Sequence, residues 1–311
     1  MARQRLAYAH WLRQMRRGAM MNVQARNGTG AAPTAGWWRA WCERVRLGRW
    51  AHFLVLPLAT YDPFSPCCDA LLAAVRGVAS AFALLTFGYL LNSVSDRQMD
   101  LDARKNPFIA NGVGEHRHSL TGALLLSVLL ALFSPWPAQI ATAVCLAFGC
   151  VYSMGPRIKS IPFVGTLANL GNFGPLLFVG MSDATLPPHF GYVALIFGTL
   201  LLQNQLIHEA ADALEDHSGG LRTTWLALGQ RWTAVLASFL GLGATAAATR
   251  LGPSAESTAF MGVTVFGAGF PVLLAWRGAH ASDAARLRVT HRWCALAFGI
   301  AIFTAWRWGT R

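Results

Sequence analysis

The sequence predicts an all-α, polytopic membrane protein with about nine transmembrane helices in a single bundle around a cytoplasm-facing cavity. Two observations favour this fold class: 54% of the 311 residues are hydrophobic, and only 13% are charged. Apolar runs also recur roughly every 30 residues, and several approach the 20 or so residues that one membrane-crossing helix needs. A sheet is disfavoured, because an open sheet cannot satisfy its backbone in lipid and the alternation typical of a barrel is missing.

The predicted spans follow one another from residue 48 to residue 308. They are 48–61, 71–92, 119–136, 138–153, 161–181, 190–208, 231–249, 256–276 and 293–308. The first is the weakest, because its apolar part is short and Arg46 and Arg49 must extend their charged ends out of the membrane. The third and fourth form a hairpin through 134–137. Residues 46–311 are therefore expected to form one transmembrane domain behind a basic, flexible, cytoplasmic tail at 1–45.

Basic residues predict the orientation. The predicted loops 93–118, 154–160, 209–230 and 277–292 are rich in arginine and lysine, whereas the opposite loops contain only Arg250. This asymmetry places the N-terminus in the cytoplasm. A bacterial inner membrane is the expected location, with the mitochondrial inner membrane as an alternative, because the arginine-rich start resembles a transit peptide. No nucleic-acid partner is expected despite the net charge of +12, because the arginines follow the membrane side and no binding module is visible.

Acidic residues are scarce and clustered. Half of the 14 lie in two windows, which contain Asp96, Asp100 and Asp102, then Glu209, Asp212, Glu215 and Asp216. Asn92, Asp96 and Asp100 are spaced four residues apart, and each step of four rotates by about 40° on a helix, so their side chains form one slanting stripe. Asp212 and Asp216 repeat this spacing. Gly219 and Gly220 then end the second helix.

Two carboxylate stripes on the same side of the membrane point to a metal-dependent anion site. Like charges that face each other repel unless cations lie between them. Mg²⁺ typically takes one or two carboxylates together with phosphate oxygens, so the stripes are suited to hold a diphosphate through bridging Mg²⁺. Either stripe alone is equally compatible with a solvated helix end. The basic residues expected to contact the diphosphate are Arg104, Lys105, Arg157, Lys159 and Arg222.

From about Arg46 to its end, the chain resembles the UbiA superfamily of intramembrane prenyltransferases. Asn92, Asp96 and Asp100 match the first motif of that family, NxxxDxxxD. The second motif, DxxxD followed by a glycine and a basic-Ser/Thr-Thr triplet, is matched by Asp212, Asp216, Gly220 and Arg222-Thr223-Thr224. The segment 152–162 is similar to the tyrosine–proline–basic loop of the family, at Tyr152, Pro156 and Lys159. The chain departs from the family at Ser93, at Lys105-Asn106-Pro107 and at His208-Glu209. Because of these departures the resemblance does not identify the acceptor.

The resemblance implies Mg²⁺-dependent transfer of a prenyl group from a polyprenyl diphosphate to a hydrophobic, aromatic acceptor within the bilayer. It implies metal binding by Asp96, Asp100, Asp212 and Asp216, with Asn92 orienting the metal or the phosphate. Polar residues at membrane depth are the candidates for the acceptor site: Tyr152, Asn169, Asn172, His208 and the run Gln203-Asn204-Gln205. Each has a plain alternative, because intramembrane amides more often bridge helices and Tyr152 can belong to the interfacial aromatic belt.

Two other functions stay open at this point. One is transfer within the same family to a carotenoid, tetrapyrrole or lipid-phosphate acceptor. The other is an ion-coupled transporter that uses the carboxylates as its ion site. Transporters usually place coupling ions near the midplane on interrupted helices and show internal repeats. Here the acidic residues gather at one membrane face and no clear repeat is seen, which favours the enzyme.

Overall fold

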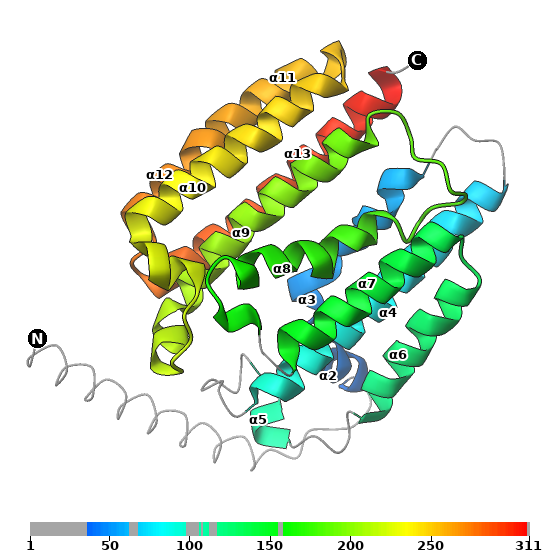
Figure 1. Ribbon diagram of the computed structural model, residues 1–311, viewed down its shortest axis with the longest axis horizontal. Helices are drawn as coiled ribbons and strands as arrows, with labels where there is room; N and C mark the ends of the chain where they lie inside the picture. The colour runs from blue at the N-terminus through cyan, green and yellow to red at the C-terminus, as the bar shows by residue number, and fades with distance from the viewer. Residues whose placement is uncertain are drawn as a thin grey trace, which may run out of the picture.

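The computed structural model describes residues 36–61, 68–97, 106, 108–111, 117–154 and 158–309, and this part of the chain is helical without a β-strand (Figure 1). The first elements are α2 (Trp37–Arg44), α3 (Leu47–Trp50), the 3₁₀ helix η1 (Ala51–Thr60), α4 (Cys68–Asp96), α5 (Phe108–Asn111), α6 (Arg117–Leu132), α7 (Trp136–Ser153) and η3 (Ile158–Ser160). They are followed by α8 (Val164–Phe173), η4 (Gly174–Leu177), α9 (Phe190–Ser218), α10 (Thr224–Ala248), η5 (Thr249–Leu251), α11 (Pro253–Gly262), the π-helical η6 (Val263–Gly269), α12 (Phe270–Arg277) and α13 (Ala281–Gly309).

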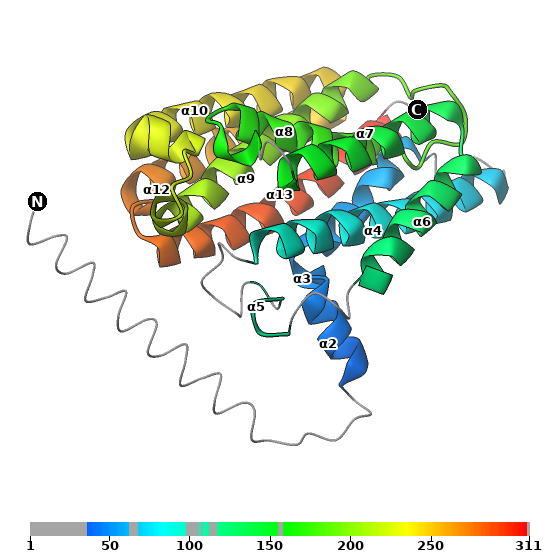
Figure 2. The same cartoon turned by 60° about the horizontal axis from the view of Figure 1, so that its bottom comes forward.

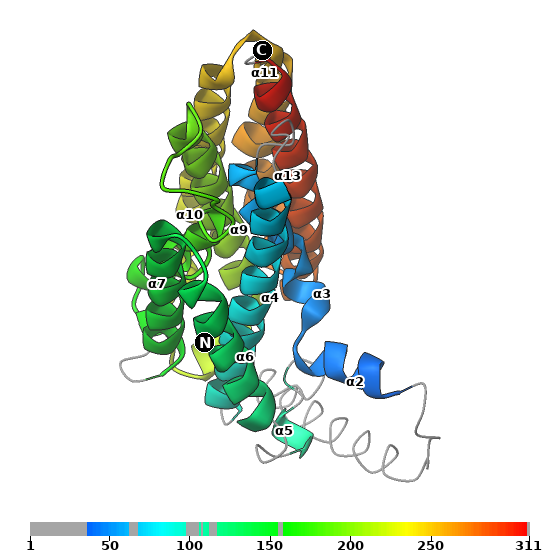
Figure 3. The same ribbon diagram turned by 90° about the vertical axis from the view of Figure 1, so that its right-hand side faces the viewer.

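The helices form two groups. In the first, α4 packs against α6, α7 and η1; in the second, α9 packs against α10 and α13 while α11 packs against α13. Figure 1 shows these groups on opposite sides of the molecule, and in the view of Figure 3 α13 lies beside α4. The short helix α8 contacts both α7 and α9. In Figure 2 the long helices α4, α9 and α13 run roughly along the length of the bundle. Each group has its own apolar core, so polar groups can gather between them.

Five helices are long and apolar enough to cross a membrane: Ala70–Asp96, Trp136–Ser153, Phe190–Ser218, Thr224–Leu251 and Pro253–Arg277. All the predicted spans fall on helical segments, but the predicted number of about nine crossings is not confirmed. The first span is a short 3₁₀ helix that contains Pro57, and the fifth is divided between α8 and η4 near Pro175. The ninth falls within α13, whose first half carries several arginines.

Large apolar side chains lie on the outer surface of the bundle. Phe133, Trp136, Phe239, Phe260 and Trp276 are each at least 63% exposed. Apolar surface of this extent is unfavourable in water and favourable against lipid tails. Together with the five apolar helices, this surface indicates an integral membrane protein.

The end of α9 fits the glycine signal in the sequence. Gly219 follows the last helical residue, and Gly220 has a φ of +72°, the left-handed conformation that glycine adopts without strain. The amide of Leu221 then donates to the carbonyl of Asp216 at 2.8 Å, which satisfies one of the free carbonyls at the helix end. The second acidic window therefore lies on a helix whose end is well defined.

Candidate active site

A cavity of about 240 Å³ lies between the two helix groups, and both acidic windows line it. Asn92 and Asp96 reach it from the end of α4, and Asp212 and Asp216 reach it from the last turns of α9. The sequence predicted that these two stripes face each other, and the structure places their described members on the walls of one cavity. This juxtaposition is the geometric feature on which the rest of the site depends.

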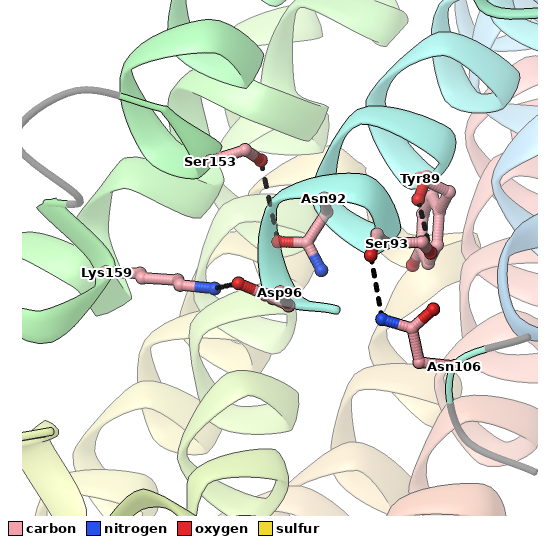
Figure 4. Close-up of polar contacts among 7 residues, drawn as sticks. All are labelled: Tyr89, Asn92, Ser93, Asp96, Asn106, Ser153 and Lys159. Carbon is pink, nitrogen blue, oxygen red and sulfur yellow. Dashed lines mark hydrogen bonds and ion pairs between the residues drawn. The ribbon is translucent and has the colours of Figure 1, made fainter. Parts of the chain in front are cut away.

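Asp96 is the carboxylate that the described part of α4 contributes to the cavity, and only 8% of its surface is exposed. Its Oδ1 atom forms an ion pair with Nζ of Lys159, which extends from η3 toward α4 (Figure 4). Oδ1 of Asn92 accepts a 3.5 Å hydrogen bond from the hydroxyl of Ser153 at the end of α7. The predicted basic residue Lys159 is thus next to the predicted acidic motif, and its ammonium group neutralises one of the carboxylates.

Asn106 fixes the end of α4, a role that the sequence analysis missed. It is fully buried, and its amide donates to the carbonyl of Ser93 at 2.7 Å (Figure 4). Its carbonyl oxygen accepts from the amide of Phe108 at 3.1 Å, which is an Asx turn. The Asn-Pro pair at 106–107 was the available signal, because this pair favours the start of a turn.

On the α9 wall, Nδ1 of His208 lies 3.1 Å from Oδ2 of Asp212, which follows His208 by one turn of the helix. Both side chains line the cavity together with Asp216. His208 is therefore next to a predicted metal ligand. A hydrogen bond from the imidazole would orient the Asp212 carboxylate, as partners of ligating carboxylates commonly do.

Unlike the predicted metal ligands of its window, Glu209 is held by hydrogen bonds from neighbouring helices. It is buried, and Oε1 accepts from the hydroxyl of Thr166 at 2.6 Å while Oε2 accepts from the backbone amide of Trp225 at 3.0 Å. The hydroxyls of Thr166 and Thr224 are 2.6 Å apart, and Thr224 also accepts from the amide of Phe163. Glu209 thus connects α8, α9 and the start of α10, with both oxygens occupied by these donors.

The position of Lys159 depends on a close backbone approach. A Cβ atom at Gly165 would lie 2.6 Å from the carbonyl oxygen of Lys159. Only glycine at the start of α8 leaves room for η3 to pack this closely. The local sequence therefore holds the lysine side chain against the α4 wall.

The predicted acceptor residues Tyr152, Asn169 and Asn172 also line the cavity, from α7 and α8. The Asn169 amide donates to the carbonyl of Gly165 at 3.0 Å and lies next to the side chain of Tyr152. Gln203 is different: it is fully buried and donates to the carbonyls of Ala237 and Phe266 at 2.6 and 2.7 Å. Its hydrogen bonds connect helices inside the bundle, which is the alternative that the sequence analysis gave for an intramembrane amide.

Several predicted residues are not placed at the cavity. Asp100, Arg104, Lys105 and Arg157 lie outside the residues that the structure describes. Arg222 is exposed and does not line the cavity, although its neighbours Leu221 and Thr223 do. Its contact with a diphosphate stays a prediction.

The cavity also has a basic wall that the sequence analysis did not assign to the site. Arg46 and Arg49 line it from the segment before η1, and Arg288 and Arg292 line it from α13. The sequence analysis expected Arg46 and Arg49 to extend their charged ends out of the membrane, and it used Arg288 and Arg292 only as part of a basic loop. Their approach to the aspartates depends on the packing of the first and last helices, which no local pattern reveals.

The residues present fit a site for Mg²⁺ and phosphate oxygens. Within the described ranges, no group of three or more His, Cys, Asp or Glu residues is placed to hold a metal ion on its own. Carboxylates on two walls, Asp96 from α4 and Asp212 and Asp216 from α9, suit an ion that takes one or two carboxylates and completes its shell with phosphate and water. The Lys159 ammonium forms an ion pair with Asp96, so this carboxylate faces positive charge within the cavity.

The fold and the site together define a helical membrane protein in which aspartates from two helices line one cavity suited to Mg²⁺ and phosphate oxygens. The model of the UbiA prenyltransferase family matches residues 50–297. The chain therefore belongs to the UbiA prenyltransferase family, and it is a prenyltransferase. A comparison with curated proteins gives no match.

Solved structures share the fold. A digeranylgeranylglyceryl phosphate synthase is 14% identical, with a TM-score of 0.66 over 86% of this chain and 98% of its own. A UbiA homolog from Archaeoglobus fulgidus, bound to GPP and Mg²⁺, is 18% identical, with a TM-score of 0.61 over 85% and 99%. The apo structure of a UbiA homolog from Aeropyrum pernix K1 is 17% identical, with a TM-score of 0.62 over 82% and 96%.

Proposed function

We propose that this protein transfers a prenyl group from a polyprenyl diphosphate to a hydrophobic acceptor within the membrane, with Mg²⁺ as its cofactor. The observation that carries the proposal is the meeting of the α4 and α9 aspartates in one cavity. Homologs from Archaeoglobus fulgidus with the same fold bind GPP or DMAPP together with Mg²⁺. The same ligands suit the donor set of this cavity.

Asp96 and Asp100 hold metal from the α4 side, and Asp212 and Asp216 hold it from the α9 side. Asn92, next to Asp96, orients the metal or a phosphate oxygen. Bound Mg²⁺ would neutralise the diphosphate and make it a better leaving group. Lys159 lies beside Asp96, so it can contact a phosphate at the same wall. We assign to it the stabilisation of the negative charge that develops on the leaving diphosphate. Arg104, Lys105, Arg157 and Arg222 are proposed to contribute further positive charge.

The reaction breaks the bond between the allylic carbon and the diphosphate oxygen, and both electrons of that bond leave with the pyrophosphate. The acceptor carbon then forms the new bond to the allylic carbon and loses a proton. The helices around the site keep water from the cationic carbon. Tyr152 and Asn169 line the cavity together and are assigned to orienting the acceptor, with Asn172 beside them. His208 is the candidate base, and an aromatic acceptor is the chemistry that best fits attack by carbon.

An apolar cavity of about 370 Å³ provides room for the isoprenoid chain. It lies between η1, α9 and α13 and is lined by side chains such as Leu56, Ile196, Phe197 and Phe303. Phe53 and Leu201 line both this cavity and the polar one, so the two spaces adjoin. A chain in the apolar cavity removes its surface from water while its diphosphate stays at the aspartates.

The direct test is to incubate membranes that contain the protein with labelled farnesyl, geranylgeranyl and longer diphosphates, together with a lipid extract. We expect one labelled lipid product that is absent from membranes without the protein. Mass spectrometry of that product identifies the acceptor. Labelled prenyl alcohol and pyrophosphate alone, with no prenylated acceptor, would contradict the transfer reaction.

We also propose the orientation that the basic loops predict, with residues 1–45 as a cytoplasmic tail, residues 46–311 as the transmembrane domain and the cavity open to the cytoplasm of a bacterial cell. Reporter fusions near residues 105 and 218 are expected to report the cytoplasmic side in both cases. Opposite readings would separate the two acidic windows across the membrane and exclude a shared site.

A further inference from the structure

The polar and the apolar cavity meet at a junction, where the bond-forming step of the proposed reaction has to take place. Five side chains line both cavities and define this junction: His52, Phe53, Leu201, Asn204 and Arg292. In the proposed complex the diphosphate lies at the aspartates and the isoprenoid chain lies in the apolar cavity. The allylic carbon that connects these two parts therefore lies at the junction, and so does the acceptor carbon that attacks it.

Only one of the five junction side chains is able to take up a proton at neutral pH. Phe53 and Leu201 are hydrocarbons, the amide of Asn204 is not basic, and Arg292 already carries its proton. The acceptor carbon loses a proton after the new bond forms, so a base has to lie close to it. The composition of the junction leaves His52 for this role.

The imidazole of His52 is held in place by ring packing. Its centroid lies 4.1 Å from that of Phe53, and the buried Phe53 ring in turn lies 4.5 Å from the ring of Phe173. Within the described residues, the half-buried side chain of His52 makes no hydrogen bond or ion pair. The ring nitrogens are therefore available to a ligand at the junction, while the packed rings restrict their orientation.

Two other histidines of the described chain line these cavities, and each has a partner. Nδ1 of His208 lies 3.1 Å from Oδ2 of Asp212, and His208 lines the polar cavity but not the apolar one. Nε2 of His291 lies 2.8 Å from Oε1 of Gln203, and His291 lines the apolar cavity but not the polar one. His208 is the candidate base that follows from the sequence, whereas the two cavities favour His52.

We propose that His52 is the base of the transfer reaction and that His208 orients Asp212. The inference rests on the proposed transfer function and adds a catalytic residue to it. Once the acceptor carbon has bonded to the allylic carbon, a ring nitrogen of His52 takes the proton from that acceptor carbon. The two electrons of the broken C–H bond return to the acceptor and restore its double bonds.

The charges around His52 suit a base that holds the proton only briefly. Arg292 borders the junction, and Arg288 lines the polar cavity one turn earlier on α13. Like charges disfavour an imidazolium at this place, so His52 is neutral before the reaction. Afterwards the same repulsion favours release of the proton, and the pyrophosphate formed in the polar cavity is an anion that can receive it.

The test separates proton loss from donor binding. His52→Gln removes the basic nitrogen, so transfer to a lipid extract should fall by about a hundredfold or more. The affinity of the purified full chain for a non-hydrolysable prenyl thiodiphosphate with Mg²⁺ should change by about threefold or less. Transfer is then compared between lipid extracts from cells grown in ordinary and in deuterated medium. We expect deuterium to slow the variant more than the wild type, because proton loss limits the rate only when the base is missing.

Matched histidine variants keep the result interpretable. His280→Gln removes an exposed histidine and should leave transfer and donor affinity unchanged. His208→Gln should weaken donor binding in the presence of Mg²⁺, because it removes the partner of Asp212, and its isotope effect should equal that of the wild type. Melting temperature and size-exclusion profiles check that each variant is folded.

Any of three outcomes overturns the inference: His52→Gln transfers at the wild-type rate, it loses transfer with the isotope effect of the wild type, or it weakens donor binding as much as transfer. An enlarged isotope effect in His208→Gln alone would return the role of base to that residue. If the wild-type protein with Mg²⁺ neither binds the thiodiphosphate nor forms a labelled product, the proposed function itself fails. Loss of the base alone leaves donor binding intact and is therefore a distinct result.

Discussion

Asp96→Asn and Asp212→Asn are each expected to reduce prenyl transfer by on the order of a thousandfold or more, because in the proposed mechanism each removes a carboxylate that holds the metal–diphosphate unit. Asparagine has nearly the same shape as aspartate, so packing around the cavity is preserved while the charge is lost. The two residues belong to different helix groups yet line the same cavity. Turnover of labelled geranylgeranyl diphosphate in membranes is the measurement.

The matched control is Asp183→Asn, which removes an exposed carboxylate whose contacts are with Thr185. This variant should keep nearly full turnover and a nearly unchanged melting temperature. A double variant of Asp96 and Asp212 that is folded and still active would remove the aspartates from the mechanism. Equal losses in the control variant would indicate a general effect of the assay or of folding.

Removal of divalent cations should stop the reaction completely. With excess EDTA we expect turnover to fall to the level of membranes without the protein, because the diphosphate is then a poor leaving group and repels the aspartates. Added Mg²⁺ should restore turnover. Ca²⁺ should restore much less, because it prefers six to eight oxygen ligands at longer distances.

The same experiment has a clear opposing result. Full turnover in excess EDTA, with the metal content of the membranes checked by mass spectrometry, would show that the leaving group departs without a metal. In that case Lys159 and the arginines of the cavity would be the remaining candidates for charge stabilisation.

The site was predictable where it depends on local spacing. Asn92 and Asp96 fall on one helical stripe, and so do Asp212 and Asp216, because the period of an α-helix alone determines which side chains share a face. The glycines after α9 gave the helix end by the same kind of local rule. The meeting of the stripes followed from hydropathy and basic loops, which placed both helix ends on one side of the membrane.

The partners of these residues were not predictable in the same way. Glu209 and Asp212 are three residues apart on one helix, yet Glu209 is held by Thr166 and Trp225 from other elements. Gln203 likewise donates its hydrogen bonds to backbone carbonyls of other elements, α10 and η6. Such roles depend on which helix packs behind a residue, and a single sequence does not contain this information. The arginines of α13 were missed for the same reason.

The central claim is that both aspartate pairs hold one metal–diphosphate unit between them. Mn²⁺ can replace Mg²⁺ in the purified protein, and electron–nuclear double resonance then detects phosphorus close to the bound metal. We predict a ³¹P coupling in the wild-type protein with a prenyl thiodiphosphate, and its loss in Asp96→Asn and in Asp212→Asn alike. A coupling that persists unchanged when both aspartates are replaced would contradict the account.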